Sequence, residues 1–247
     1  MTIQYACILE HLDVLDDKVD ISLCRNCNVQ LNFYHGFDAD HAKLMSRLEK
    51  MSIAVTSIHL PTVAFSDEGF MPLLRKAKEL YGVGLLTLHP SKAEEGKDLS
   101  QYKEQEICAL EGMADEIHDL GLLVCIENFP FENNRWVYSP NGIYTLCSET
   151  NLPIGITYDT SHTTPGVNIL DEFQQVADKV KILHLSNRDS SDPQHWKVHL
   201  PYKNGELPAE ELLKKLDFFG FDGIVVFEYA KKYYAEIVSD YRRFIGR

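Results

Sequence analysis

The sequence predicts a single (β/α)8 barrel, also called a TIM barrel, that spans residues 1–247. Short apolar runs rich in β-branched residues alternate with longer segments of helical periodicity, as expected of a parallel sheet with crossover helices. Eight such runs occur, and 247 residues divided among eight repeats leave about 31 for each, close to the size of one βα unit. No run is followed by a glycine-rich phosphate loop. This absence disfavours the alternative fold, a doubly wound sheet, and predicts no nucleotide cofactor.

The eight expected strands share an apolar composition and a length of a few residues. In chain order they lie at residues 3–9, 29–34, 52–59, 83–89, 122–127, 154–159, 180–185 and 223–228. The segments between them carry apolar stripes at helical spacing, for example Ile237, Tyr241 and Phe244. Residues 10–28 show little periodicity, so the first βα unit is the least defined part of the expected barrel.

The overall charge limits the kinds of partner. The chain has 24 basic and 37 acidic residues, a formal net charge of -13. An acidic protein is poorly suited to neutralising phosphate backbones, so a nucleic-acid partner is not expected. No apolar run approaches the length of about 18 residues that a membrane helix needs, and no signal segment is seen at the N-terminus. A cytoplasmic protein without membrane contact is expected.

The six cysteines are too few for a disulfide framework in a chain of this length. Cys24 and Cys27 form a C-x-x-C pair, but a structural zinc site would need further cysteine or histidine ligands at suitable spacing. Cys108 and Cys125 are expected to be small core residues. No metal or redox role is therefore assigned to the cysteines.

Six of the eight expected strands end on a residue type that binds metal ions. These residues are His59, His89, Glu127, Asp159, His184 and Glu228. The carboxyl ends of barrel strands meet at one face, where the active sites of TIM-barrel enzymes lie. Carboxylates gathered there repel one another unless a cation lies between them. Taken alone, Asp159 could instead cap the next helix.

The strand ends therefore predict a divalent-metal site that is rich in oxygen ligands and has one imidazole. Its expected ligands are Glu127, Asp159, His184 and Glu228. Such a ligand set suits Mn, Zn, Co or Mg.

Further polar and aromatic residues follow the expected strands. His162 follows the sixth strand, and His195 and His199 lie in the long loop after the seventh. Loops of this length in a compact domain are often functional. Asn128 directly follows the fifth strand and begins a loop whose aromatic residues would either wall a pocket or pack in the core. These aromatic residues are Phe129, Phe131, Trp136 and Tyr138.

Taken as an ordered set, the motifs of the chain resemble the xylose isomerase-like barrel family, which includes sugar isomerases and epimerases and zinc-dependent apurinic endonucleases. The motifs run from about residue 50 to residue 230: IHLP, LHPS, IENF, YDTSH, LHLS, the H-x-x-x-x-x-G from His199 to Gly205, and FEY. The epimerase branch implies one divalent metal on the four ligands above, with Glu127 and Glu228 as an acid/base pair and His162 in contact with a sugar substrate. The substrate arginine of that branch is matched here by Ser190, and Arg188 lies two residues before it.

The endonuclease branch holds three zinc ions on nine residues. The resemblance implies eight of them in this chain: His59, His89, Glu127, Asp159, His162, His184, His199 and Glu228. The ninth, an aspartate in that branch, is Lys197 here. A cation in this position is expected to weaken the third zinc site.

The function expected from the sequence is a metal-dependent isomerase or epimerase of a small sugar or related polyol ketone, with or without a phosphate. The alternatives are a multi-zinc phosphoester hydrolase and a catalytically silent sugar-binding barrel. The expected substrate contacts are Asn128, His162, Arg188 and Trp136. The candidates for additional metal or substrate contacts are His59, His89, His162 and His199.

Overall fold

Eight parallel strands close into a barrel in the computed structural model of the chain, which describes residues 3–130, 134–192 and 195–245. The barrel strands are β1 (Gln4–Glu10), β2 (Asn28–Asn32), β3 (Ala54–His59), β4 (Leu85–Leu88), β5 (Leu123–Glu127), β6 (Ile154–Asp159), β7 (Val180–Leu185) and β10 (Ile224–Phe227). They follow one another around the barrel, and β1 closes it by pairing with β10. The predicted (β/α)8 barrel is confirmed, and no strand boundary differs from its predicted position by more than two residues.

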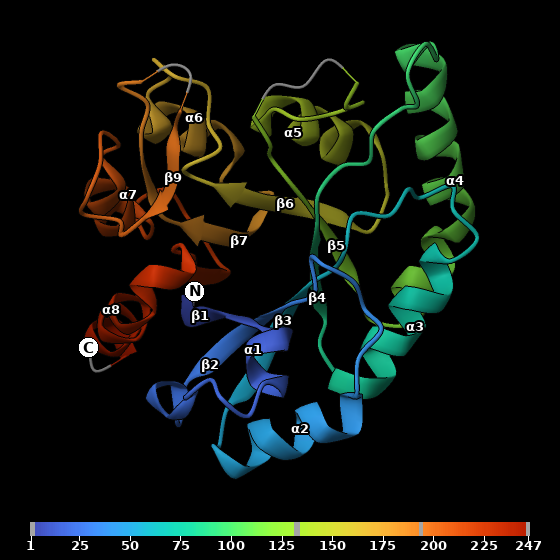
Figure 1. The fold of residues 1–247 in the computed structure, drawn as a ribbon. Helices are drawn as coiled ribbons and strands as arrows, with labels where there is room; N and C mark the ends of the chain where they lie inside the picture. Colours follow the sequence, from blue (N-terminus) through green and yellow to red (C-terminus); the bar gives the residue numbers. More distant parts are fainter. Residues whose placement is uncertain (1–2, 131–133, 193–194, 246–247) are drawn as a thin grey trace.

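Helices cover the outside of the barrel (Figure 1). They are α1 (His11–Leu15), α2 (His41–Lys50), α3 (Phe70–Tyr81), α4 (Leu99–Asp119), α5 (Pro140–Glu149), α6 (Ile169–Val176), α7 (Ala209–Lys215) and α8 (Tyr234–Ile245), with short 3₁₀ turns η1 (Ser22–Cys24) and η2 (Lys231–Tyr233). Each long helix turns an apolar stripe to the strands; α3 buries Phe70, Leu74 and Ala77 in this way. In the described part of the chain, no helix combines the length and apolar character that a membrane span requires.

Local sequence signals fix several helix ends. The Asp98 side chain accepts hydrogen bonds from the backbone N–H groups of Ser100 and Gln101 and so caps α4. Ser139 caps α5, whose first residue, Pro140, needs no N–H partner there. Helix α3 ends at Gly82, which has a left-handed φ of 67°. These caps set the points at which the chain turns back to the next strand.

Residues 10–28, the least defined part of the expected barrel, hold only the short α1 and η1. The structure differs from the sequence predictions in two places. The expected long loop after β7 contains a two-stranded antiparallel ribbon, β8 (Asn187–Asp189) and β9 (Lys197–Leu200), which is too short to show strand periodicity. The prediction that Cys108 is a core residue is wrong because it lies on the exposed face of α4, whereas Cys125 is buried in β5.

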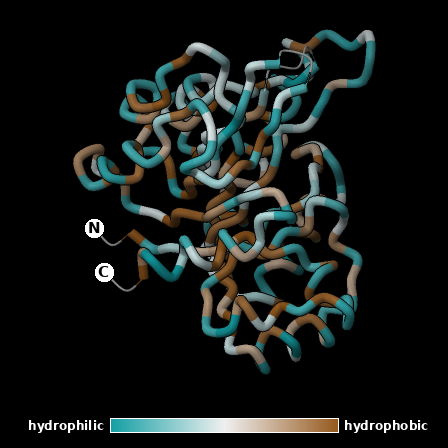
Figure 2. The backbone as a smooth tube through the Cα atoms, turned by 60° about the vertical axis from the view of Figure 1, so that its left-hand side comes forward, coloured by the Kyte–Doolittle hydropathy of each residue, from teal (hydrophilic) through white to brown (hydrophobic). Residues whose placement is uncertain are grey.

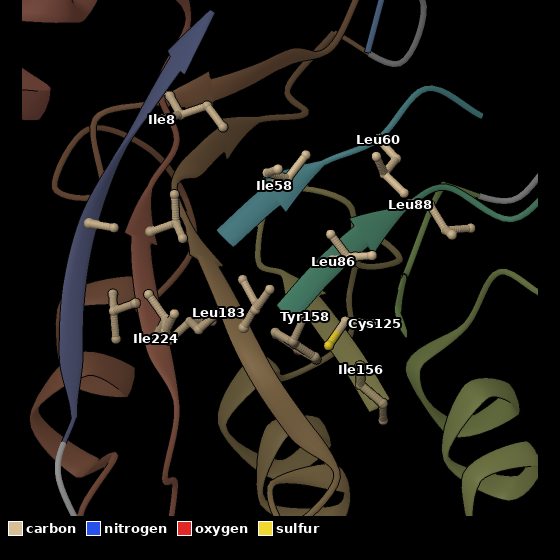
Figure 3. Close-up of a cluster of buried hydrophobic side chains, with 14 of the residues drawn as sticks. Ile8, Ile58, Leu60, Leu86, Leu88, Cys125, Ile156, Tyr158, Leu183 and Ile224 are labelled. Atoms are coloured by element: carbon tan, nitrogen blue, oxygen red, sulfur yellow. The ribbon is translucent and has the colours of Figure 1, made fainter. Parts of the chain in front are cut away.

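The hydrophobic core joins the strands to the inner faces of the helices. Hydrophobic segments gather in the interior of the fold and hydrophilic ones lie mainly at its periphery (Figure 2). Ile58, Leu86 and Ile156 come from three different strands and are fully buried in this core (Figure 3). Such packing gives the strand ends a rigid support.

A layer of polar side chains lies inside the barrel, one step below the strand ends. Gln30 donates hydrogen bonds to Ser57 and Thr87, and Thr87 bonds to Thr157. All four side chains are fully buried. Because alternate residues of a strand share a face, they lie below Asn32, His59, His89 and Asp159, respectively. The hydrogen bonds of this layer support the residues at the strand ends above it.

Glu106 of α4 stabilises two of the loops that follow the strands through hydrogen bonds. Its buried carboxylate accepts hydrogen bonds from the backbone N–H groups of Phe65 and Ser66 and from the hydroxyl groups of Ser66 and Ser91. These loops follow His59 and His89. Glu106 therefore holds the chain segments that leave β3 and β4.

Replacing Glu106 by alanine is expected to lower the free energy of unfolding by about 3 kcal/mol or more, because it leaves several buried donors without an acceptor. Urea unfolding followed by circular dichroism measures this loss. Glu104→Ala, an exposed carboxylate on the same helix, is the matched control and should change stability by less than about 0.5 kcal/mol. Equal stabilities of the two variants would contradict the role of Glu106 in stabilising these loops.

Candidate metal centre

Three groups of potential metal ligands meet at the carboxyl ends of the barrel strands. The first group is His59, His89 and Glu127; the second is Glu127, Asp159, His184 and Glu228; the third is Asp159, His162 and His199. Within each group the ligand atoms lie within 4.8 Å of one another. Glu127 belongs to the first two groups and Asp159 to the last two, so the three groups form one continuous cluster.

Glu127 lies at the middle of this cluster. Its Oε2 atom is 3.0 Å from His59 Nε2 and 3.2 Å from His89 Nε2. Its Oε1 atom is 3.2 Å from His184 Nδ1 and 3.4 Å from His162 Nδ1. All five side chains are buried. A single carboxylate is thus surrounded by four imidazoles from four different strands or their loops.

The two oxygens of Asp159 have different roles. Oδ1 accepts hydrogen bonds from the backbone N–H and the hydroxyl of Ser161, at 2.6 and 2.9 Å, and so stabilises the turn after β6. Oδ2 lies 3.5 Å from His162 Nδ1 and 3.8 Å from His199 Nδ1. The alternative that Asp159 caps the next helix is wrong, because α6 begins at Ile169 and is capped by Asn168. Asp159 Oδ2 is therefore available as a metal ligand in the cluster.

Several residues of the cluster have buried polar atoms without hydrogen bonds. Among the described residues, Asp159 Oδ2, His184 Nε2 and His199 Nδ1 have no hydrogen-bond partner. Buried polar atoms in this state raise the free energy of a fold unless an ion or water satisfies them. Imidazole nitrogens and carboxylate oxygens that converge in this way are the ligands of divalent transition metals. The residues present therefore fit a bound divalent cation.

The charges of the cluster depend on one another. Burial opposes ionisation of Glu228, but His184, whose Nδ1 lies 2.6 Å from Glu228 Oε2, outweighs it and lowers the pKa of this carboxyl to about 2. Burial raises the pKa of Asp159; His162 and His199 oppose this shift, and the neighbouring Glu228 and Glu127 add to it. A divalent cation would relieve the repulsion among these carboxylates.

An open cavity lies above the cluster. Its volume is about 460 Å³, within the range of small-molecule sites. His59, His89, Glu127 and Glu228 lie at its floor. The rings of Tyr34 and Phe129 stand edge-on to His89, with centroid distances of 5.2 and 4.8 Å, and form two of its walls. A ligand in this cavity would reach the metal-binding groups directly.

Comparison with known proteins identifies the family. A model of the xylose isomerase-like TIM barrel family matches residues 68–243. The chain belongs to this family. Its sequence is 22% identical over 202 residues to the uncharacterized protein MJ1188 of Methanocaldococcus jannaschii. The aligned region covers 76% of this chain and 71% of that protein.

Solved structures of the same fold extend over the whole barrel. A D-tagatose 3-epimerase-like protein has a TM-score of 0.73 and 16% identity, with 98% of each chain covered. An AP endonuclease of family 2 from Brucella melitensis has a TM-score of 0.73 and 15% identity, with 98% of each chain covered. Other similar structures include sugar epimerases, a probable dehydratase, and proteins with bound zinc or magnesium. At these identities the likeness shows the fold alone.

Two of the substrate contacts expected in this xylose isomerase-like barrel lie elsewhere. Arg188 is buried and binds Glu206 at 2.9 Å and the backbone carbonyls of Ser161 and Thr163, so it secures loops behind the cluster. Trp136 packs edge-on to Phe65 instead of facing a ligand. Neither side chain lines the cavity. Both expectations are corrected because tertiary packing takes each side chain away from the barrel mouth; Phe131 lies outside the described residues.

Asn128 is also a positioning residue in this arrangement. Its Nδ2 donates to the Asp159 carbonyl at 2.9 Å, and its Oδ1 accepts from the Asp159 N–H at 2.6 Å. The side chain is fully buried and does not line the cavity. Asn128 therefore fixes the end of β6, and the predicted substrate contact is replaced by this contact with the backbone.

The third group lacks the extra ligand of the endonuclease branch. Lys197 is 68% exposed, and its Nζ lies 3.2 Å from Asp189. His195 is 79% exposed and contacts Asp192, so it also lies apart from the cluster. His199 does reach the third group, although its own φ of 53° is left-handed. The third group therefore has three candidate ligands.

The residues of the cavity wall that the sequence did not indicate include Glu10, Asn32, Tyr34 and Lys231. The signal was present, because β1 ends at Glu10 and β2 ends at Asn32, so these strands also end on polar residues. The predicted boundaries of the first two strands, 3–9 and 29–34, concealed it.

Proposed function

We propose that the chain is a divalent-metal-dependent isomerase or epimerase that acts on a small sugar or a related polyol ketone. The observation that carries the proposal is the second group, in which the buried carboxylates of Glu127 and Asp159, the partly buried Glu228 and the buried His184 face one another at the cavity. This oxygen-rich set suits Mn, Zn, Co or Mg. The sugar epimerases among the similar structures support the same reaction class.

Glu127 and Glu228 are the proposed acid/base pair. A bound divalent cation would supply polarisation of a substrate carbonyl, which acidifies the C–H bond beside it. Glu127 comes from β5 and Glu228 follows β10, so the two carboxylates approach His184 from opposite sides of β7. One accepts the proton from the carbon beside the carbonyl and the other returns a proton to its other face. Glu228 also lines the cavity, so its carboxylate is within reach of a ligand bound there.

Proton exchange with solvent tests this proposal. Protein loaded with manganese is incubated in heavy water with pentoses and hexoses in their keto form, and deuterium at the carbon beside the carbonyl is followed by NMR. We expect deuterium to be incorporated at this carbon in at least one sugar, with or without net conversion to a second sugar. Full metal loading with binding of sugars but no exchange would contradict the proposal and favour a catalytically silent sugar-binding barrel.

A second candidate function, a multi-zinc phosphoester hydrolase, is favoured by one observation. The first and third groups add His59, His89, His162 and His199 around the same carboxylates. Glu127 and Asp159 would then help to hold two or three ions, which would supply activation of water for attack on a phosphoester. The outward position of Lys197 weighs against this candidate, because it leaves the third group without a further carboxylate.

Replacing His89 by alanine separates the two candidates. The isomerase proposal expects about the same metal content per chain and retained exchange, because the second group is intact. The hydrolase alternative expects a loss of about one zinc and of any hydrolysis of a nitrophenyl phosphodiester. Elemental mass spectrometry and a colorimetric assay measure these outcomes, and His195→Ala, an exposed histidine, is the matched control.

A further inference from the structure

Two neighbouring strands present polar groups to the cavity that the proposed proton transfer does not use. The strand register sets Glu10 of β1 beside Asn32 of β2, and Asn32 beside His59 of β3. The three residues therefore form one row around the barrel mouth, and all three line the cavity. This row continues the first group of metal ligands from β3 along the adjacent strands β2 and β1.

Hydrogen bonds fix the orientation of this pair. Asn32 Oδ1 accepts from the backbone N–H of Tyr34 at 2.8 Å, which leaves Asn32 Nδ2 to donate to Glu10 Oε1 at 2.7 Å. Asn32 is buried, so its amide has little freedom to turn. The Glu10 carboxylate is thus held in place by a residue that is itself held by the backbone.

One oxygen of Glu10 remains available to a ligand. Its Oε2 atom is buried and has no hydrogen-bond partner among the described residues. An ionised carboxylate oxygen accepts hydrogen bonds from hydroxyl groups but offers nothing to a phosphate oxygen, which is also an acceptor. The preferred ligand is therefore a donor such as a sugar hydroxyl.

The described cavity wall has no unpaired cation for an anionic substituent. Lys231 is the one lysine or arginine among the described residues that line the cavity, and its Nζ lies 2.5 Å from Asp13 Oδ1. Glu10, Glu127 and Glu228 add three carboxylates to the same wall and floor. A phosphate at the unreacted end of a sugar would meet this negative charge.

We infer that Glu10, positioned by Asn32, determines substrate specificity by binding hydroxyl groups at the unreacted end of a neutral sugar or polyol ketone and by disfavouring the same sugar with a terminal phosphate. The inference rests on the proposed function and names the substrate class of that site. The Tyr34 ring, 43% exposed beside the same row, gives the C–H face of the sugar an apolar surface.

Matched sugar pairs test the inference in the heavy-water exchange assay. The probes are D-fructose with D-fructose 6-phosphate, D-ribulose with D-ribulose 5-phosphate, and D-xylulose with D-xylulose 5-phosphate. The metal-loaded wild-type protein should give a higher kcat/KM for the free member of a pair. Glu10→Gln should raise KM for the free sugar about 10- to 100-fold, the range for a lost hydrogen bond to a charged group, with a much smaller change in kcat.

The metal content of Glu10→Gln should equal that of the wild type, because Glu10 belongs to none of the three ligand groups. Glu68→Gln removes an exposed carboxylate from the loop after β3 and should behave as the wild type. Glu10→Gln, unlike this control, should also reduce the preference for the free sugar.

Equal or faster exchange of the phosphorylated sugars by the wild type would overturn the inference and leave the proposed function intact. An unchanged KM in a folded Glu10→Gln variant would do the same. If neither the free sugars nor the phosphorylated sugars show exchange at full metal loading, the proposed function itself is contradicted. The inference would then be contradicted too. The wild-type comparison does not depend on the folding of the variant.

Discussion

Replacing Glu228 by glutamine is expected to lower kcat for proton exchange by about 10²- to 10⁴-fold, the usual contribution of one acid/base group. The amide has nearly the same shape as the carboxylate but does not accept a proton from a C–H bond. The fold should survive, because the backbone N–H of Glu228 remains bonded to the Leu185 carbonyl and the barrel below is unchanged. Exchange in heavy water measures kcat, and circular dichroism checks the fold.

The control for Glu228→Gln must separate proton transfer from metal binding, because Glu228 is also a ligand candidate. Metal content is therefore measured on the same sample, and the assay is repeated with excess manganese. Glu236→Gln, an exposed residue of α8, is the matched control. A metal-loaded Glu228→Gln variant with full activity would remove Glu228 from the mechanism, and recovery of full activity by excess metal would reduce it to a ligand.

Removing the metal is expected to destabilise the fold as well as to stop turnover. Without a cation, Glu127, Asp159 and Glu228 are left close together in a buried cluster. A cation that binds only the folded chain at about 100 times its Kd adds about 2.7 kcal/mol, which corresponds to a fall in Tm of roughly 5–10 °C when it is removed. Scanning calorimetry before and after chelation measures this fall.

Two controls make the chelation result specific. The chelator already saturated with zinc should leave Tm unchanged, and added manganese or zinc should restore the original value after the chelator is removed. Asp159→Asn, which alters two of the three groups, should show a smaller fall on chelation than the wild type. The same Tm with and without metal would show that the buried carboxylates are satisfied in another way.

The barrel could be predicted from the sequence because its signal is local and repeated. Six of the eight apolar runs end on a residue that an apolar environment does not tolerate without a partner, as at His59, Glu127 and Asp159. Barrel topology then brings these ends together whatever the loops do. For this reason the predicted metal ligands are also those that the structure gathers into the three groups.

The rest of the site depends on contacts that the sequence does not show. Arg188 follows β7 as a substrate residue would, but Glu206 and nearby carbonyls bind its guanidinium. The relation of Glu10 to Asn32 depends on strand register, which a shift of one residue in a predicted boundary conceals. Glu127 and Asp159 each belong to two of the ligand groups. Only distances in space reveal this, because the sequence indicates a single metal ligand at each position.

Metal content per chain tests the central claim most directly. Protein purified without chelators or a metal-affinity column is analysed by elemental mass spectrometry, with His89→Ala beside the wild type. A metal-dependent isomerase should contain about one Mn, Zn, Co or Mg per chain, retained in His89→Ala. Two or three zinc ions per chain would favour the hydrolase, and a chain that is isolated without metal and does not bind added metal would contradict the proposed function.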